Sequence, residues 1–343
     1  MATADYWSSA DLKGIPFGGL INEDVMQQIW DISQIPLPLQ DLMGSDAVSN
    51  SYTEWTEDKL SDADITNAAV DGQDLTGNDA SGGARIGNQC QISTKTVIVT
   101  ERAQSSDTIG RADELSYQVM MRQRELRRDK EAIFLTGQAS VADDGDTVAG
   151  RLGGLMACIT QGNRGTGSGG GFSSGTWAAY VPGTGRGLTE TMVRDVAQQV
   201  WEAGGNPSTL MSVPSVIRAL SSYMFTASAR IATLTGETNN EGPATAMGSV
   251  NVFLTDFGVE LRMVPNRLQQ LYDDIADTPV GALFFLDPAY VREGTLRGER
   301  VEPLAKTGLA DKRAMAVDYT LKVLNREAHG IITDIDPTVA VVT

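Results

Sequence analysis

The stretch GRADELSYQVMMRQRELRRDKEAIFLTG, residues 110–137, constrains the fold most, because its pattern predicts one long helix. Its apolar residues recur at helical spacing on a single stripe, which consists of Ala112, Leu115, Val119, Leu126 and Ile133. Asp107 is the predicted N-cap and Gly137 the predicted end, which gives a helix about 40 Å long at about 1.5 Å per residue. A single stripe predicts one side packed on a sheet or core and charged sides that face solvent or a neighbouring molecule.

The charged sides of this helix are rich in cations, namely Arg122, Arg124, Arg127, Arg128 and Lys130. They stand out in a chain whose formal net charge is −17. Two interpretations stay open. In the first, the cations pair with Glu125, Asp129 and Glu131 of the same helix. In the second, they face an acidic surface elsewhere.

Composition excludes several classes of protein. With 343 residues, 41% of them hydrophobic, the chain is long enough for a substantial core, and no apolar run approaches the roughly 20 residues of a membrane span. The first residues, MATADYWSSADLKG, show no basic leader or apolar stretch, so no secretion signal is expected. Cys90 and Cys158 are too few for a disulfide framework and fit a reducing cytoplasm. The excess of 44 acidic over 27 basic residues argues against a grip on duplex DNA.

A long projecting hairpin is predicted before the helix. The segment IPLPLQ (35–40) is expected to be an extended arm, and strands are expected in SYTEWTEDKL (51–60) and ARIGNQCQISTKTVIVTERA (84–103). In the second strand segment, alternation places Ile86, Cys90, Ile92 and Ile98 on one side. The loop between the strands carries Asp62, Asp64, Asp71, Asp74 and Asp79. A loop near 25 residues usually serves a function or contacts a partner.

The remaining chain mixes helices and strands. Surface loops are expected over 138–188, a helix over 188–205, a strand over 209–213 and a helix from Pro214 to Met224. A hairpin turning at 256–258 and further strands over 282–298 and 314–335 follow. This order predicts an α+β fold.

Sequence motifs give little support for catalysis. The G-x-S-x-G pattern at 171–175 places Ser173 before His329 in hydrolase order, but the residues before it are too rich in glycine to form the strand of a nucleophile elbow. The G-x-G-x-x-G pattern at 165–170 likewise follows no strand, and no Gly-Lys pair exists for a phosphate-binding loop. One histidine and two distant cysteines cannot form an ordinary zinc site, and the acidic hairpin lacks calcium-loop spacing. We expect no enzyme, cofactor or metal, with a Ser173-dependent hydrolase as the alternative from another class.

The order of arm, acidic hairpin, long helix and mixed α/β unit resembles the Hong Kong 97 fold of the major capsid proteins of tailed phages. Four stretches are similar to one capsid family of this fold, formerly a domain of unknown function: VIVTERA (97–103), 110–138, GRLGGLMACI (150–159) and 284–335. The resemblance implies an N-terminal arm (1–45), an E-loop hairpin with its base strands (46–105) and a P-domain spine helix (106–138). It further implies an A-domain (139–290) and C-terminal strands that return to the P-domain (291–343).

The resemblance implies a self-assembling head shell of hexameric and pentameric capsomers, made in the host cytoplasm, that encloses double-stranded DNA without reading its sequence. Implied partners are a portal protein, a separate scaffolding protein because the arm is short, and a cement or decoration protein, with no membrane. Some relatives cross-link their subunits covalently through a Lys–Asn isopeptide bond that uses a lysine of the E-loop. This chain has no lysine between Leu60 and Arg85, so a non-covalent shell is expected. An encapsulin-type cargo shell is the alternative within the fold.

The resemblance also bears on the basic helix, because in this fold the E-loop of one subunit lies over the spine-helix region of its neighbour. We therefore predict an inter-subunit contact between the five hairpin aspartates and the five cations of the helix. Each exposed pair contributes only about 0–1 kcal/mol, but opposite charges steer and align the contact.

Overall fold

The computed structural model describes residues 36–339, apart from 62, 73, 75–76, 78–81, 107–110, 112, 224–251 and 275. Most of the predicted arm therefore lies outside the described residues. So do Asp62 and Asp79 of the hairpin, the expected N-cap Asp107, and Met224, the expected last residue of a helix.

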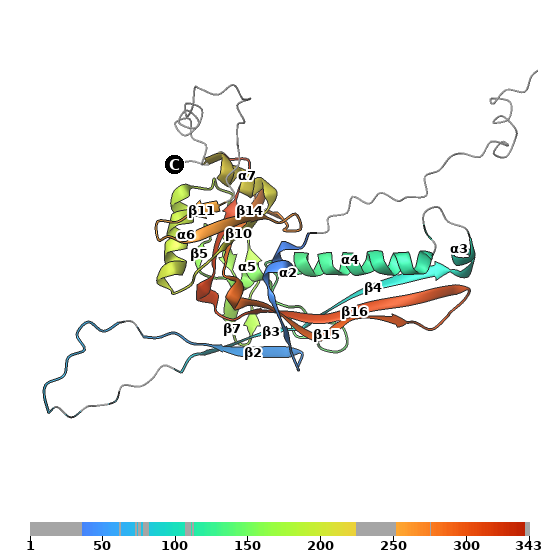
Figure 1. The fold of residues 1–343 in the computed structure, drawn as a ribbon, viewed down its shortest axis with the longest axis horizontal. Coiled ribbons are helices and arrows are strands. Elements are labelled where there is room, and N and C mark those ends of the chain that lie inside the picture. The colour runs from blue at the N-terminus through green and yellow to red at the C-terminus, as the bar shows by residue number, and fades with distance from the viewer. Residues whose placement is uncertain are drawn as a thin grey trace, which may run out of the picture.

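Two sheets organise the described chain, as Figure 1 shows. The first has the strand order β1 (Gly44–Ala47), β15 (Val291–Pro303), β16 (Ala310–Val323) and β4 (Gln91–Thr100). The second has the order β11 (Val252–Leu254), β12 (Glu260–Pro265), β10 (Thr209–Ser212), β14 (Pro279–Leu286), β17 (Gly330–Ile335) and β5 (Gly162–Asn163), with β13 (Tyr272–Asp273) beside β14. Long antiparallel pairing of β15 with β16, and of β16 with β4, builds the first sheet. Together with its helices, this confirms the α+β prediction.

The long helix α4 (Glu114–Phe134) has 21 residues, which corresponds to about 32 Å at about 1.5 Å per residue. The predicted N-cap at Asp107 was wrong, because Asp113 caps the helix by accepting a hydrogen bond from the Ser116 backbone N–H at 3.3 Å. The helix ends three residues before Gly137. The expectation of about 40 Å was therefore too long.

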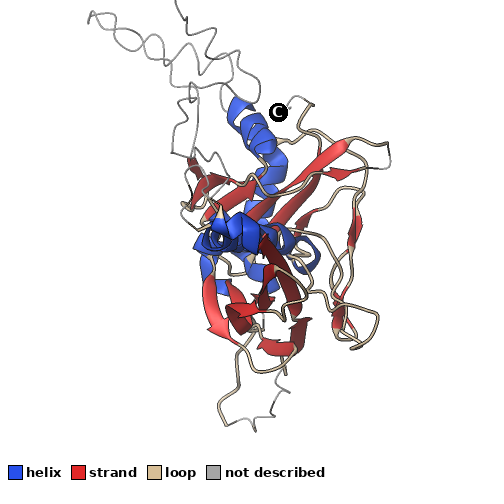
Figure 2. Ribbon diagram, turned by 90° about the vertical axis from the view of Figure 1, so that its right-hand side faces the viewer, coloured by secondary structure: helices blue, strands red, loops and turns tan. Residues whose placement is uncertain are grey.

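Helix α4 lies along one face of the first sheet (Figure 1), and Figure 2 views the molecule from the end at which this helix begins. The predicted stripe meets this sheet: Leu126 is buried with Val97 and Val99 of β4, while Leu115, Val119 and Ile133 pack partly buried against the same cluster. At the end of the helix, the Phe134 ring meets Tyr319 of β16 edge to face, with 5.3 Å between centroids.

The projecting hairpin is confirmed. Its strands β2 (Tyr52–Glu57) and β3 (Ala84–Gln89) pair antiparallel, and the loop between them extends away from α4 (Figure 1). The root is fixed by Asn88, whose side-chain amide donates to the carbonyls of Gly153 and Leu321 at 3.1 and 2.8 Å. Trp177 Nε1 donates to the Gly87 carbonyl at 2.9 Å. The hairpin therefore starts from a well-anchored base.

The predicted facing of the second strand segment was only half right. Ile86 and Cys90 are buried, but Ile92 and Ile98 are exposed, and Val97 and Val99 face the core instead. The segment is two strands, β3 and β4, separated at Cys90, and the chain changes sheets there. Neighbouring residues of a strand point to opposite faces. After the break at Cys90 the odd-numbered residues face the core, whereas the prediction had placed the even-numbered ones there.

The segment IPLPLQ, expected to be extended, instead leads into helix α2 (Pro38–Leu42). Leu37, which precedes a proline, is non-helical, and Pro38 occupies the start of the helix, where its fixed φ and missing N–H are tolerated. Leu39 of this helix is fully buried. This part of the arm is therefore packed on the subunit.

Helices α6 (Glu190–Glu202) and α7 (Pro214–Tyr223) pack near the second sheet, where Val196 and Val200 of α6 and Leu220 of α7 share a core with Phe285. The strand at 209–212 and the hairpin turning at 256–258 confirm the predictions. Short elements complete the described chain: α3 (Glu101–Ser105), α5 (Leu155–Cys158), β6 (Ser168–Gly169), β7 (Phe172–Ser173), β8 (Thr176–Trp177), β9 (Tyr180–Val181), η1 (Pro288–Tyr290) and η2 (Arg326–Ala328).

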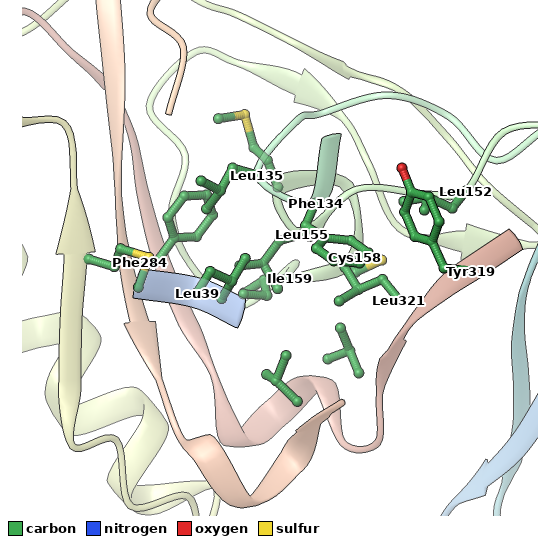
Figure 3. Packing of buried hydrophobic residues seen from close by; sticks show 14 of the residues in the cluster. Leu39, Phe134, Leu135, Leu152, Leu155, Cys158, Ile159, Phe284, Tyr319 and Leu321 are labelled. Carbon is green, nitrogen blue, oxygen red and sulfur yellow. The ribbon is translucent and has the colours of Figure 1, made fainter. Parts of the chain in front are cut away.

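One core joins the two sheets. Figure 3 shows Leu39 of α2, Phe134 of α4, Leu155 of α5 and Phe284 of β14 gathered with Tyr319 of β16. Helix α5 falls inside the segment 138–188 that was expected to be surface loops, and all four of its residues are buried. The apolar run LMAC is too short for helical periodicity to be recognised, so its burial could not be read from the pattern.

Candidate assembly interface

The loop of the hairpin exposes apolar side chains as well as carboxylates. Leu60, Ile65 and Val70 are 92%, 98% and 75% exposed. Asp64, Asp71 and Asp74 are also exposed. Isolated exposed apolar residues are ordinary, whereas three on one projecting loop make this loop the candidate contact surface of the subunit.

Three of the predicted cations of α4 have carboxylate partners within their own chain. Arg122 pairs with Glu125 at 2.5 Å, Arg127 with Glu299 of β15 at 3.3 Å, and Lys130 with Glu293 of β15 at 2.6 Å. Arg124 is exposed and Arg128 half-buried. The expectation that the charged sides face outward was wrong for Lys130, which is only 6% exposed.

The described aspartates of the hairpin do not approach α4 of the same chain, because the loop and the helix extend to opposite ends of the molecule (Figure 1). A contact between Asp64, Asp71 or Asp74 and the helix would have to join two copies. The inter-subunit contact therefore stays a prediction.

The structural role of Glu131 was not predicted from the sequence. This fully buried carboxylate accepts hydrogen bonds from the backbone N–H groups of Leu39 and Gln40 at 2.7 and 3.0 Å, and from Asn266 Nδ2 at 2.7 Å. Burial raises the pKa of Glu131, and the hydrogen bonds oppose this. One side chain thus ties α2, α4 and the segment after β12 together. One signal for this role was present in the sequence. Leu37 stands at the N-cap of α2 and has no side chain that can accept a hydrogen bond, so the free N–H groups of the first turn need an acceptor from another segment.

The catalytic alternative finds no support in the geometry. Ser173 lies exposed in the two-residue strand β7, which pairs with β8 in a short hairpin rather than entering a helix. His329 is fully buried, and its Nδ1 accepts a hydrogen bond from the Asp287 backbone N–H at 3.2 Å. Within the described part of the chain, no group of three potential metal ligands was found, and no helix is long and apolar enough to cross a membrane.

His329 is expected to make the subunit sensitive to acid. Burial lowers the pKa of His329 to about 4 from an ordinary 6.5, so the folded subunit holds the neutral ring while the unfolded chain binds a proton. The contribution of the neutral His329 ring to the free energy of unfolding is therefore fully present above pH 6.5. It is lost as the pH falls toward 4, and the total loss is about 3 kcal/mol. Urea unfolding from pH 7 to 4 should show this loss, and His329→Gln should remove it. Equal slopes for both proteins would contradict it.

Comparison with known proteins identifies the family. The family model of the SU10 major capsid protein matches residues 8–336. The chain belongs to this capsid family. A curated relative, the major capsid protein of Escherichia phage Phieco32, is 23% identical over 328 residues, which cover 86% of this chain and 89% of the relative.

Solved structures of phage capsids share the fold. The capsid of a native GTA particle aligns with a TM-score of 0.59 at 14% identity, over 94% of this chain and 98% of that one. The capsid of Cyanophage P-SCSP1u aligns with a TM-score of 0.56 at 13% identity, over 91% and 92%. The SrpI encapsulin of Synechococcus elongatus PCC 7942 aligns with a TM-score of 0.53 at 13% identity, over 94% and 96%. At these identities the structures establish the Hong Kong 97 type of fold, while the family match establishes a phage major capsid protein, a structural component of the virion head shell.

Proposed function

We propose that this subunit forms hexameric and pentameric capsomers that close into an icosahedral, non-covalent shell around double-stranded DNA. The observation that carries the proposal is the projecting hairpin, whose described loop residues expose apolar and acidic side chains instead of packing them on the subunit. The five-part division into arm, E-loop, spine helix, A-domain and C-terminal strands is part of the same proposal. A negative net charge of −17 supports enclosure of DNA without adhesion to it.

The non-covalent shell rests on the positions of the lysines. No lysine occurs between Leu60 and Arg85. The nearest lysines on either side form ion pairs within the subunit, Lys59 with Glu327 at 3.0 Å and Lys95 with Asp129 at 2.6 Å. We expect purified particles, boiled in detergent, to give one band at 36.6 kDa. A ladder of covalent multiples that resists boiling and reductant would contradict this.

The proposed partners are a portal protein, a separate scaffolding protein and a cement or decoration protein. The resemblance to tailed-phage capsid proteins supports all three. Coexpression with the neighbouring genes tests them: particles of uniform size are expected only when the scaffolding gene is present. Uniform closed shells from the capsid chain alone would argue against a separate scaffolding protein.

The predicted charge contact can be tested by reversal. If the hairpin aspartates meet α4 of a neighbour, Arg122→Glu combined with Arg127→Glu should lower shell yield several-fold in low salt. The reversal also breaks the pairs with Glu125 and Glu299. The matched control is therefore Glu125→Gln with Glu299→Gln, which loses the same internal pairs but keeps both cations. Equal yields for the reversal and the wild type would reject the contact.

A further inference from the structure

The sequence contains two Asp–Gly pairs, Asp71–Gly72 in the loop of the projecting hairpin and Asp144–Gly145 in the segment after α4. Such pairs are prone to rearrange to isoaspartate, because glycine has no Cβ to keep its backbone nitrogen away from the preceding carboxyl group. Both pairs are exposed, and both glycines have a positive φ, +82° at Gly72 and +74° at Gly145. Sequence and exposure therefore do not distinguish the two pairs.

Hydrogen bonds hold the Asp144–Gly145 pair in an unreactive arrangement. The Asp144 carboxylate accepts from three consecutive backbone N–H groups, those of residues 146–148, at 2.8 to 2.9 Å. The nitrogen that would attack is also engaged, since the Gly145 N–H donates to the Asp143 carboxylate at 2.9 Å. The hydrogen bond from the Asp146 N–H, together with the others, lowers the pKa of Asp144 to about 2 and so disfavours the protonated carboxyl group that loses water.

The Asp71–Gly72 pair of the hairpin loop lacks such hydrogen bonds. Within the part of the chain that the structure describes, neither the Asp71 carboxylate nor the Gly72 N–H takes part in a hydrogen bond or an ion pair. No interaction has to break before the carboxyl group and the nitrogen of this pair turn toward one another. The structure therefore separates a free pair from a protected one.

We propose that Asp71–Gly72 is a site of spontaneous isomerisation to isoaspartate, with water as the only co-reactant, and that the fold protects Asp144–Gly145 from the same reaction. The Gly72 nitrogen bonds to Cγ of Asp71, and the carboxyl OH leaves as water with the amide proton, which gives a succinimide ring. Water then opens the ring. Opening at the backbone carbonyl of Asp71 leaves the main chain running through Cγ, and the composition of the protein is unchanged.

Isomerisation changes the shape of the hairpin loop but not its charge. The main chain through Asp71 becomes one carbon longer, and the carboxylate moves onto Cα. Ile65 and Val70 of the same loop are exposed and belong to the candidate contact surface of the subunit. Subunits that age before assembly should therefore form fewer shells. This consequence rests on the proposed function, whereas the isomerisation itself does not.

Ageing of the unassembled full-length subunit at neutral pH tests the site. Peptide mapping by mass spectrometry separates the two isomers of each Asp–Gly peptide, so Asp144 is an internal control in every sample. Isoaspartate should form at Asp71 at least about tenfold faster than at Asp144, since several hydrogen bonds must break before the Asp144 pair can react. In urea the two rates should become equal. Equal rates in the folded subunit, or an Asp144 pair that stays slow in urea, would overturn the proposal.

Asp71→Glu is the matched variant for the effect on assembly, because Glu–Gly closes the larger imide ring far more slowly. Each protein is aged, then assembled, and compared with its own fresh sample. Aged wild type should lose shell yield in proportion to its isoaspartate content, and aged Asp71→Glu should not. Equal losses in the two proteins would show that isomerisation at Asp71 does not impair assembly. Fresh wild-type subunits that never form shells would overturn the proposed function and not the isomerisation.

Discussion

Replacing Lys130 with methionine is expected to destabilise the subunit by about 3–5 kcal/mol, the usual cost of removing one partner of a buried ion pair. The Lys130 ammonium lies 2.6 Å from Glu293 and 3.9 Å from Glu299, and the Lys130 side chain is almost completely covered. Without it, Glu293 of β15 faces the underside of α4 without its partner, while Glu299 keeps its pair with Arg127. Urea unfolding of the unassembled subunit, followed by tryptophan fluorescence, measures the loss.

A second substitution provides the control for Lys130. Adding Glu293→Leu to Lys130→Met replaces the pair by apolar side chains, which is often neutral, and should recover most of the loss. If Lys130→Met alone costs less than about 1 kcal/mol, the pair behaves like a surface ion pair and the helix is not fixed to its sheet in this way.

Glu131→Ala is expected to cost about 3 kcal/mol. Three donors lose their acceptor, at roughly 1–3 kcal/mol for each buried one, while relief from burying a charge offsets part of the loss. Two of these donors are backbone N–H groups of α2, so the arm should also become sensitive to protease near residues 36–42. Unfolding and limited proteolysis of the same samples measure both effects.

Two variants of the same helix make the Glu131 result specific. Glu131→Gln keeps one acceptor oxygen and should lose less than Glu131→Ala. Glu125→Ala removes a partly exposed carboxylate paired with Arg122 and should change stability by less than about 1 kcal/mol. Equal losses for Glu125→Ala and Glu131→Ala would show that the contacts of Glu131 with α2 and Asn266 contribute little.

Much of the architecture could be predicted from the pattern of residues. The stripe through Leu126 predicted the long helix and its buried side, and alternation and turn residues predicted the hairpins. Both depend on local periodicity, which a single sequence carries directly. The capsid fold came instead from the resemblance of several stretches to a known family.

Which charged side chains of the helix are buried, and which groups they contact, could not be predicted in the same way. Lys130 and Glu131 border the apolar stripe, and whether such residues are solvated or buried depends on what another segment supplies. Here Glu293 pairs with Lys130, and the N–H groups of Leu39 and Gln40 donate to Glu131; all three partners are distant in sequence. The outward-facing Ile92 and Ile98 were missed for a related reason, since the sheet change at Cys90 resets the alternation.

The two buried charges also have a consequence for assembly. Lys130 fixes α4 to the first sheet, and Glu131 fixes α2 and the segment after β12 to α4. The projecting hairpin is therefore carried by a subunit whose helices and first sheet are held together. Such a frame suits a subunit that repeats one contact around a closed ring.

Negative-stain microscopy combined with sedimentation of the expressed chain, with and without its neighbouring genes, tests the central claim most directly. The account predicts closed icosahedral shells, or hexamers and pentamers that assemble when the scaffolding gene is supplied. A folded monomer under every one of these conditions would contradict it.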